Sequence, residues 1–205
     1  MDETSLAQRV GTAADLSLAS RAGLPDDLKL LIARYPRDVW TAHANLGQMA
    51  RFWLSRHDMF RELGASLDQA TAQFRDGKID ARGFASFFAP RLQFFLQQLH
   101  THHHIEDDHY FPIFRAAESR LSHGFDMLDR DHEMLAARID GSVTAANAFL
   151  RAMDGPPDAV ARAADDYANA GGILLNGLIR HLGDEEDLIV PLILDRGEDA
   201  LGVGH

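Results

Sequence analysis

One pattern of eleven residues occurs twice in this sequence: His, three residues, Glu, an acid, Asp, three residues and Pro. The first copy spans residues 102–112 and the second spans residues 181–191, so the His-to-Pro spacing is ten in both. A shorter echo precedes each copy, at residues 57–60 and 132–135, where His is followed by an acid, Met and a bulky apolar residue. The chain is therefore interpreted as two related hairpins, each carrying two imidazoles and one carboxylate at matched positions.

The apolar residues indicate that both hairpins are helical. They recur mostly at steps of three or four along four long stretches, which is the spacing of one buried helix face. No stretch of any length alternates as a strand would. We expect helices at about residues 40–70, 82–117, 119–153 and 158–195. The predicted fold is all-α, an up-down-up-down four-helix bundle with an N-terminal extension.

Each apolar stripe is interrupted by polar residues near its middle. The interrupting residues are His57, His102, Glu106, His132, His181 and Glu185. Counted from the expected turns, the interruptions lie at similar distances along their helices, within about one turn at 1.5 Å rise per residue. The four imidazoles should therefore meet in one layer of the bundle, with both carboxylates one turn further along.

Such a set of side chains suits metal ions. A His and a Glu four residues apart share one helix face, and a carboxylate can bridge two cations. A buried carboxylate without a partner costs several kcal/mol, and no Lys or Arg lies on these stripes. Cysteine is absent, so any metal must be held by N and O donors. A ferritin-like site needs Glu-x-x-His on two helices, and only Glu106 with His109 fits that pattern.

Composition limits the remaining function classes. The length of 205 residues suits one domain, divided here into an N-terminal extension at 1–36 that is partly disordered with a short helix, the bundle at 37–197 and a tail at 198–205. A net charge of -11 argues against nucleic acid and anionic membranes as partners. The N-terminal residues show no signal-peptide pattern and no apolar run is long enough to span a bilayer, so a cytoplasmic location is expected.

The segments LHTHHHIEDDHYFP and RHLGDEEDLIVP, together with His57 and His132, resemble the hemerythrin-like, HHE cation-binding domain. The resemblance covers about residues 40–195. It implies a four-helix bundle with a non-haem di-iron centre, in which Glu106 and Glu185 are the bridging carboxylates. The ligands carried over are His57, His102, Glu106, His132, His181 and Glu185.

Two ligand positions differ from the oxygen-carrying hemerythrins. Their last helix carries Asp five residues after its His, whereas this chain has Glu185 four residues after His181. Their third helix carries two His four residues apart, whereas Leu128 and Ala136 flank His132 at that spacing. The candidates for a seventh ligand are His103, one position away from the stripe, and Tyr110. The alternative for His103 is a surface or supporting role, and for Tyr110 it is core packing.

The expected cofactor is a pair of metal ions, with iron favoured and manganese or zinc as alternatives. The expected function is to bind or sense O₂, NO or a redox signal, so the partner is a small diatomic or an azide-like anion. An oxidoreductase acting on peroxide, NO or O₂ is the alternative, and a structural metal site is the third hypothesis. Gly171, Gly172 and Gly177 either leave a cavity or allow close helix packing.

Overall fold

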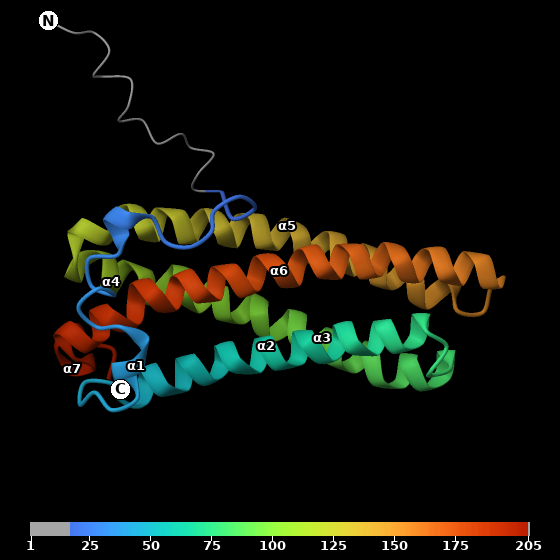
Figure 1. Ribbon diagram of the computed structural model, residues 1–205, viewed down its shortest axis with the longest axis horizontal. Coiled ribbons are helices and arrows are strands. Elements are labelled where there is room, and N and C mark those ends of the chain that lie inside the picture. Colours follow the sequence, from blue (N-terminus) through green and yellow to red (C-terminus); the bar gives the residue numbers. More distant parts are fainter. Residues whose placement is uncertain (1–16, 205) are drawn as a thin grey trace, which may run out of the picture.

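The computed structural model describes residues 17–204 and is built on four long antiparallel helices (Figure 1). They are α2 (Gln48–Arg75), α3 (Ala81–Ile105), α5 (Ser122–Ala152) and α6 (Pro157–Arg196). Successive helices run in opposite directions, and α2 and α6, the first and last, also pack against each other. The expected up-down-up-down bundle is confirmed for the described residues. None of the helices in this range is both long and apolar enough to cross a membrane.

Short elements gather at one end of the bundle, around the turn between its second and third long helices (Figure 1). They are η2 (Asp26–Leu28), α1 (Arg37–Trp40), α4 (Phe111–Ala117), η4 (Ser119–Leu121) and α7 (Glu198–Leu201). The expected disorder at the N-terminus falls mainly on residues 1–16, which lie outside the described part. Leu18 is only 4% exposed, so the chain from this point onward is part of the packed structure. The proposed domain boundaries stay predictions.

Local sequence explains most helix ends. The Asp80 carboxylate accepts a hydrogen bond from the backbone N–H of Gly83, which caps the start of α3. Pro157 opens α6 and Gly197, at φ +82°, ends it. The expected start of the first helix near residue 40 is wrong, because α2 begins at Gln48. Residues 41–47 form turns instead of helix.

A distant residue fixes the start of α2. The Glu198 carboxylate accepts hydrogen bonds from the backbone N–H groups of Met49 and Ala50, at 3.2 and 2.8 Å. These groups have no partner within a helix, and a carboxylate also opposes the positive end of the helix dipole. A Cβ on Gly47 would lie within 2.8 Å of the Glu198 carboxylate, so only Gly leaves room for this contact. The start of α2 therefore depends on a contact that local sequence patterns do not reveal.

The second long helix contains one turn of π-helix, η3 (Glu106–Tyr110), between α3 and α4. A π turn adds one residue and rotates the remainder of the helix about its axis. The helical spacing of the sequence also predicts Ile113 on the buried stripe after Glu106. The structure instead buries Phe111 and Phe114 and leaves Ile113 only partly covered. That part of the stripe is therefore wrong, because the π turn moves the buried face by about one residue.

The apolar core consists of two clusters. One lies at the end with the short elements and includes Trp40, Phe111 and Phe125. The other fills the opposite end and includes Phe88 and Phe149. The polar interruptions of the four stripes lie between the two clusters, so the candidate site is enclosed by apolar packing on both sides.

The aromatic packing of the second cluster predicts a large effect for one substitution. Phe149 is fully buried, with its ring 5.1 Å from Phe84 and 5.2 Å from Phe74. We expect Phe149→Ala to lower the free energy of unfolding by about 3–5 kcal/mol, because it leaves a cavity. Phe52 is 65% exposed, so Phe52→Ala should change it by about 0.5 kcal/mol or less. Urea unfolding of both variants measures this, and equal effects would contradict the packing described.

Candidate metal centre

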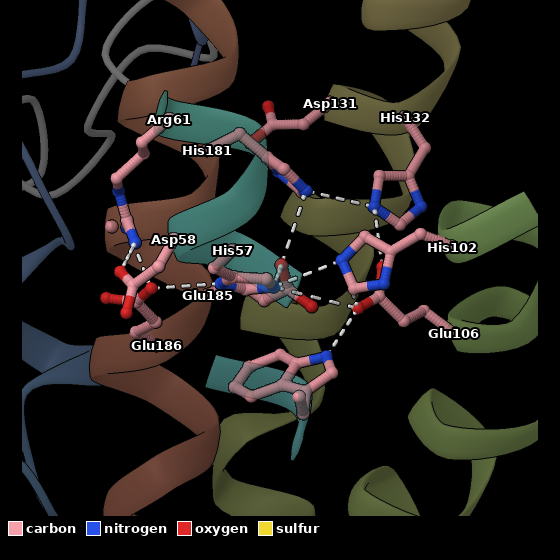
Figure 2. Close-up of polar contacts among 12 residues, drawn as sticks. His57, Asp58, Arg61, His102, Glu106, Asp131, His132, His181, Glu185 and Glu186 are labelled. Carbon is pink, nitrogen blue, oxygen red and sulfur yellow. Dashed lines mark hydrogen bonds and ion pairs between the residues drawn. The ribbon is translucent and has the colours of Figure 1, made fainter. Parts of the chain in front are cut away.

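The structure brings all six predicted site residues together in the middle of the bundle (Figure 2). Each helix contributes: α2, α3, α5 and α6 supply one imidazole each, η3 supplies one carboxylate and α6 supplies the other. All six side chains are at most 8% exposed. Four of the six side chains are imidazoles that lie close together across the bundle: His57, His102, His132 and His181.

The imidazoles form two groups, which we call the two-His half and the three-His half. In the two-His half, Nε2 of His57 lies 3.1 Å from Nε2 of His102. In the three-His half, Nε2 of His132 lies 3.0 Å from Nε2 of His181. His103 is the third member of that half, and the donor atoms of its three imidazoles lie within 4.8 Å of one another.

His103 was one of two candidates for an additional ligand, and it is the one that reaches the cluster. Its ring is 6% exposed and stacks on His132, with centroids 4.0 Å apart. Tyr110 is partly buried against the first apolar cluster, where it stacks on Phe114. The neighbouring imidazoles His100, His104 and His109 are exposed.

The two carboxylates lie between the halves. Oε1 of Glu106 is 3.0 Å from Nε2 of His102, and its Oε2 is 3.7 Å from Nε2 of His132. Oε2 of Glu185 is 3.5 Å from Nε2 of His57 and 3.5 Å from Nε2 of His181. Each carboxylate therefore faces donors from both halves, which is the position that a bridging ligand needs.

Three further carboxylates contact three of the imidazoles at Nδ1, the ring nitrogen that faces away from the cluster. Nδ1 of His57 is 2.9 Å from Glu186, Nδ1 of His132 is 2.6 Å from Asp107, and Nδ1 of His181 is 3.3 Å from Asp131. Two acids directly follow each motif Glu, and the sequence predicts that all four form a solvated rim that supports the ligands: Asp107, Asp108, Glu186 and Asp187. The contacts of Asp107 and Glu186 agree with a supporting role, but Glu186 is 2% exposed and is not part of a solvated rim.

Arginines from outside the motifs neutralise two of these carboxylates. Arg37 and Arg61 contact Glu186 at 2.8 and 2.7 Å. Arg21 binds Asp131 through both terminal nitrogens and donates from Nε to Asp184 at 2.7 Å. Sequence reasoning missed Asp131 and these arginines. Asp131 comes directly before His132, so an acid next to a stripe His is the one local signal that was present.

Trp53 adds a direct contact to a bridging candidate. Its indole Nε1–H donates to Oε1 of Glu106 at 2.6 Å, and its ring packs on His57 with centroids 4.3 Å apart. Trp53 precedes His57 by one helical turn on the same face of α2. It therefore fixes one carboxylate and one imidazole together.

The hydrogen bonds between Nδ1 of the imidazoles and the supporting carboxylates indicate whether the Nε2 atoms fit a cation. A carboxylate that accepts from Nδ1–H leaves Nε2 of that ring with a lone pair. Asp107 and Asp131 act in this way on His132 and His181, so two lone pairs face each other at 3.0 Å. This arrangement is repulsive unless a cation or a proton lies between them. The donors of the three-His half therefore fit a cation.

Unpartnered atoms lead to the same conclusion. Among the described residues, the buried side-chain atoms without a hydrogen-bond partner include Nε2 of His103, Oε2 of Glu106 and both oxygens of Glu185. Buried polar atoms are rarely left in this state, since each lost partner costs about 1–3 kcal/mol. All four atoms lie in the same cluster, and all are N or O donors. Together they fit metal ions that prefer imidazole and carboxylate ligands.

Three of the five imidazoles are held in their neutral form. Burial lowers the pKa of His181 to about 4, against the opposing effect of Asp131. Burial and the neighbouring His132 and His181 lower the pKa of His103 well below its ordinary value. Burial also lowers the pKa of His102. Neutral imidazole is the form that binds metal, so these three residues need lose no proton near neutral pH.

The two bridging candidates differ in their proton affinity. Burial and the nearby Glu106 carboxylate raise the pKa of Glu185 well above its ordinary value. Burial alone would raise the pKa of Glu106 too, but His102 and His57 lower it well below the usual range. Without a cation, the pair therefore keeps a proton on Glu185. A cation between the carboxylates would displace that proton.

The low pKa of His181 predicts how the metal-free chain responds to acid. Because the unfolded imidazole binds protons below about pH 6.5 and the folded one only below about 4, stability falls as the pH drops through this window. Between these two pH values, His181 accounts for a loss of about 3 kcal/mol in the free energy of unfolding. We expect His181→Gln to show a smaller loss than wild type, measured by urea unfolding with chelator at pH 6.5 and 4.5. Equal losses would show that His181 protonates in the folded chain.

The buried arginine predicts a second effect. The side chains of Arg21, Asp131 and Asp184 are at most 3% exposed, so Arg21→Gln leaves two buried carboxylates without their cation. We expect the free energy of unfolding to fall by about 3–5 kcal/mol. Arg34 pairs with Asp195 but its side chain is 68% exposed, so Arg34→Gln should cost about 1 kcal/mol or less. Adding Asp131→Asn to Arg21→Gln should restore part of the loss, and no restoration would contradict the role given to this pair.

Comparison with known proteins agrees with this arrangement of donors. A family model described as the hemerythrin HHE cation binding domain matches residues 48–193. That range contains all seven clustered donors and leaves out Arg21 and Arg37. No curated protein and no solved structure matches the chain. The family model covers well over half of the chain, and its name describes the chemistry that the buried donors fit. The chain belongs to the hemerythrin HHE cation-binding domain family.

Proposed function

We propose that this chain holds two metal ions, with iron favoured, in a carboxylate-bridged centre that binds or senses a small ligand such as O₂ or NO. The observation that carries the proposal is the division of five imidazoles into two halves, with two carboxylates facing both. One metal ion would need one such half. Two halves joined by shared carboxylates support a pair of ions.

Each half has its own set of proposed ligands. His57 and His102 would hold one ion, and His103, His132 and His181 would hold the other. Glu106 and Glu185 would bridge both. Imidazole and carboxylate donors without thiolate suit iron, with manganese and zinc as alternatives. Two iron ions bound in this way would supply adjacent redox-active Lewis acids.

The unequal number of imidazoles supports a site for a small ligand. With both carboxylates shared, the two-His half offers one protein donor fewer than the three-His half. A metal ion with an unfilled coordination position can bind a further ligand, whereas a structural site is closed. This count weakens the structural hypothesis. It favours a ligand position beside His57 and His102.

The surroundings of the two-His half favour a small apolar ligand. Phe60 packs on His102, with ring centroids 5.2 Å apart, and on Phe95 at 6.0 Å. Phe95 forms part of the wall of a cavity of about 30 Å³, to which Gly171 and Gly172 also contribute. Such a volume holds about one molecule of the size of water or a diatomic. Gly171 and Gly172 therefore line a cavity, whereas Gly177 allows close helix packing, since a Cβ there would clash with Nη1 of Arg138.

The same centre also suits an oxidoreductase that acts on peroxide, NO or O₂. The chemistry at the metal ions would be similar, and the difference lies in turnover. Sustained consumption of peroxide or NO by the iron form would favour the enzyme. A stoichiometric spectral change without consumption would favour a binding or sensing protein.

The metal stoichiometry of two variants tests the ligand set. Metal-free chain is loaded with Fe²⁺ without oxygen, desalted and analysed for iron. We expect about two ions per chain in wild type and about one or fewer in His102→Ala and in His181→Ala, because each half loses a donor. The matched control is His109→Gln, an exposed imidazole that should keep wild-type iron. Full occupancy in both alanine variants would show that the assignment is wrong.

Small ligands test the unfilled position. We expect azide and NO to change the absorption spectrum of iron-loaded wild type. Azide should have a much weaker effect in His102→Ala, in which the two-His half is disrupted. An iron form that contains two ions and responds to neither ligand would contradict the binding function but leave the two-metal centre intact.

A further inference from the structure

A groove lies between α3 and α5, directly outside the three-His half. Its volume is about 630 Å³ and its floor includes His103 and His132. In the two-His half, His57 and Glu185 are fully buried, His102 is 8% exposed, and Trp53 and Phe60 pack over His57 and His102. The groove therefore brings two donors of the three-His half, His103 and His132, to the edge of a solvent-open space.

Two imidazoles stand at the mouth of this groove. His100 and His104 are exposed and four residues apart on α3, so they share one helix face. Their ring centroids are 4.3 Å apart. Two imidazoles at this spacing can bind a divalent transition metal together, although weakly compared with a site of four or more donors.

Carboxylates line the groove below the imidazole pair. Asp107, Asp129, Glu133 and Asp140 all contribute to its walls, and its lining residues include no Lys or Arg. Asp129 is paired with Arg115, which leaves the negative field mainly to the other three. A cleft lined by one sign of charge raises the local concentration of the opposite ion.

Asp107 connects the groove with the buried donors. Its carboxylate contacts Nδ1 of His132 at 2.6 Å, yet its side chain is 40% exposed. The corresponding carboxylates behind His57 and His181, which belong to Glu186 and Asp131, are at most 3% exposed. The unpartnered Nε2 of His103, itself buried, belongs to the same floor. Donors therefore follow one another from solvent to the interior: the His pair, Asp107, then His103 and His132.

We propose that this groove is the entry route for the divalent cation, with His100 and His104 as a capture pair and Asp107 as the carboxylate that leads to the interior. The proposal rests on the proposed function, since it needs a metal centre to supply. It assigns to the exposed imidazoles a role in the rate of metal binding. They have no role in the final affinity, because they do not reach the buried cluster.

The rate of metal uptake by the full chain tests this. Metal-free chain is mixed rapidly with Co²⁺, and the visible absorption of bound Co²⁺ is followed. We expect the double variant His100→Gln and His104→Gln to take up Co²⁺ about tenfold more slowly than wild type. The final stoichiometry and spectrum should equal those of wild type. His109→Gln, an exposed imidazole outside the groove, is the matched control and should keep the wild-type rate.

Two further measurements separate an entry route from structural damage. If the affinity is unchanged, release of Co²⁺ to excess chelator must slow by the same factor as uptake, whereas a destabilised site would release it faster. A second double variant, Glu133→Gln with Asp140→Asn, should slow uptake and weaken its dependence on salt, because it reduces the negative field.

The outcomes are distinct. A wild-type rate in the His100 and His104 variant, or a reduced final stoichiometry, would overturn the entry route while the proposed centre stands. Failure of wild type to bind Co²⁺ or Fe²⁺ at all would overturn the proposed function, and the entry route with it.

Discussion

The structure depends on the burial of two carboxylates among five imidazoles in the middle of a helical bundle. Glu106 and Glu185 are at most 1% exposed. Burial of two neighbouring like charges is strongly unfavourable without a cation. The apolar packing is divided into two clusters because this layer cannot join either one. A proton on Glu185 relieves the repulsion only in part, since it leaves lone pairs on His132 and His181 facing each other.

The layer is held in place by charges that lie outside it. Asp131, Glu186 and Asp107 fix three imidazoles through Nδ1, and arginines from three places in the chain neutralise the two buried ones among these acids. Arg21 and Arg37 belong to the segment before α2, outside the range of the family match. Docking of that segment and the geometry of both halves are therefore linked: a change in His57 or His181 acts on a carboxylate that the segment also holds.

The sequence predicted the bundle and the six clustered residues because their signals are periodic. A repeated motif and four interrupted stripes leave few ways to arrange four helices. It could not place His103, because a residue next to a stripe turns inward only when the neighbouring helix lies on that side. The π turn was missed for a related reason. It shifts which residues of the helix face the core, but apart from Pro112 no residue type in the sequence marks it. The contacts of Arg21, Arg37 and Glu198 join distant segments, so no local pattern encodes them.

The two halves of the centre are suited to different tasks because their surroundings differ. The two-His half has fewer donors and is covered by Trp53 and Phe60, so a coordination position on a metal ion held there would lie behind apolar packing. The three-His half has more donors and borders a groove lined with acids. A cation and an uncharged diatomic need opposite environments on their way into a protein: the cation needs ligands and negative charge, and the diatomic needs only space between apolar side chains. Separate routes on separate sides would let the site gain its metal without opening the pocket for its ligand.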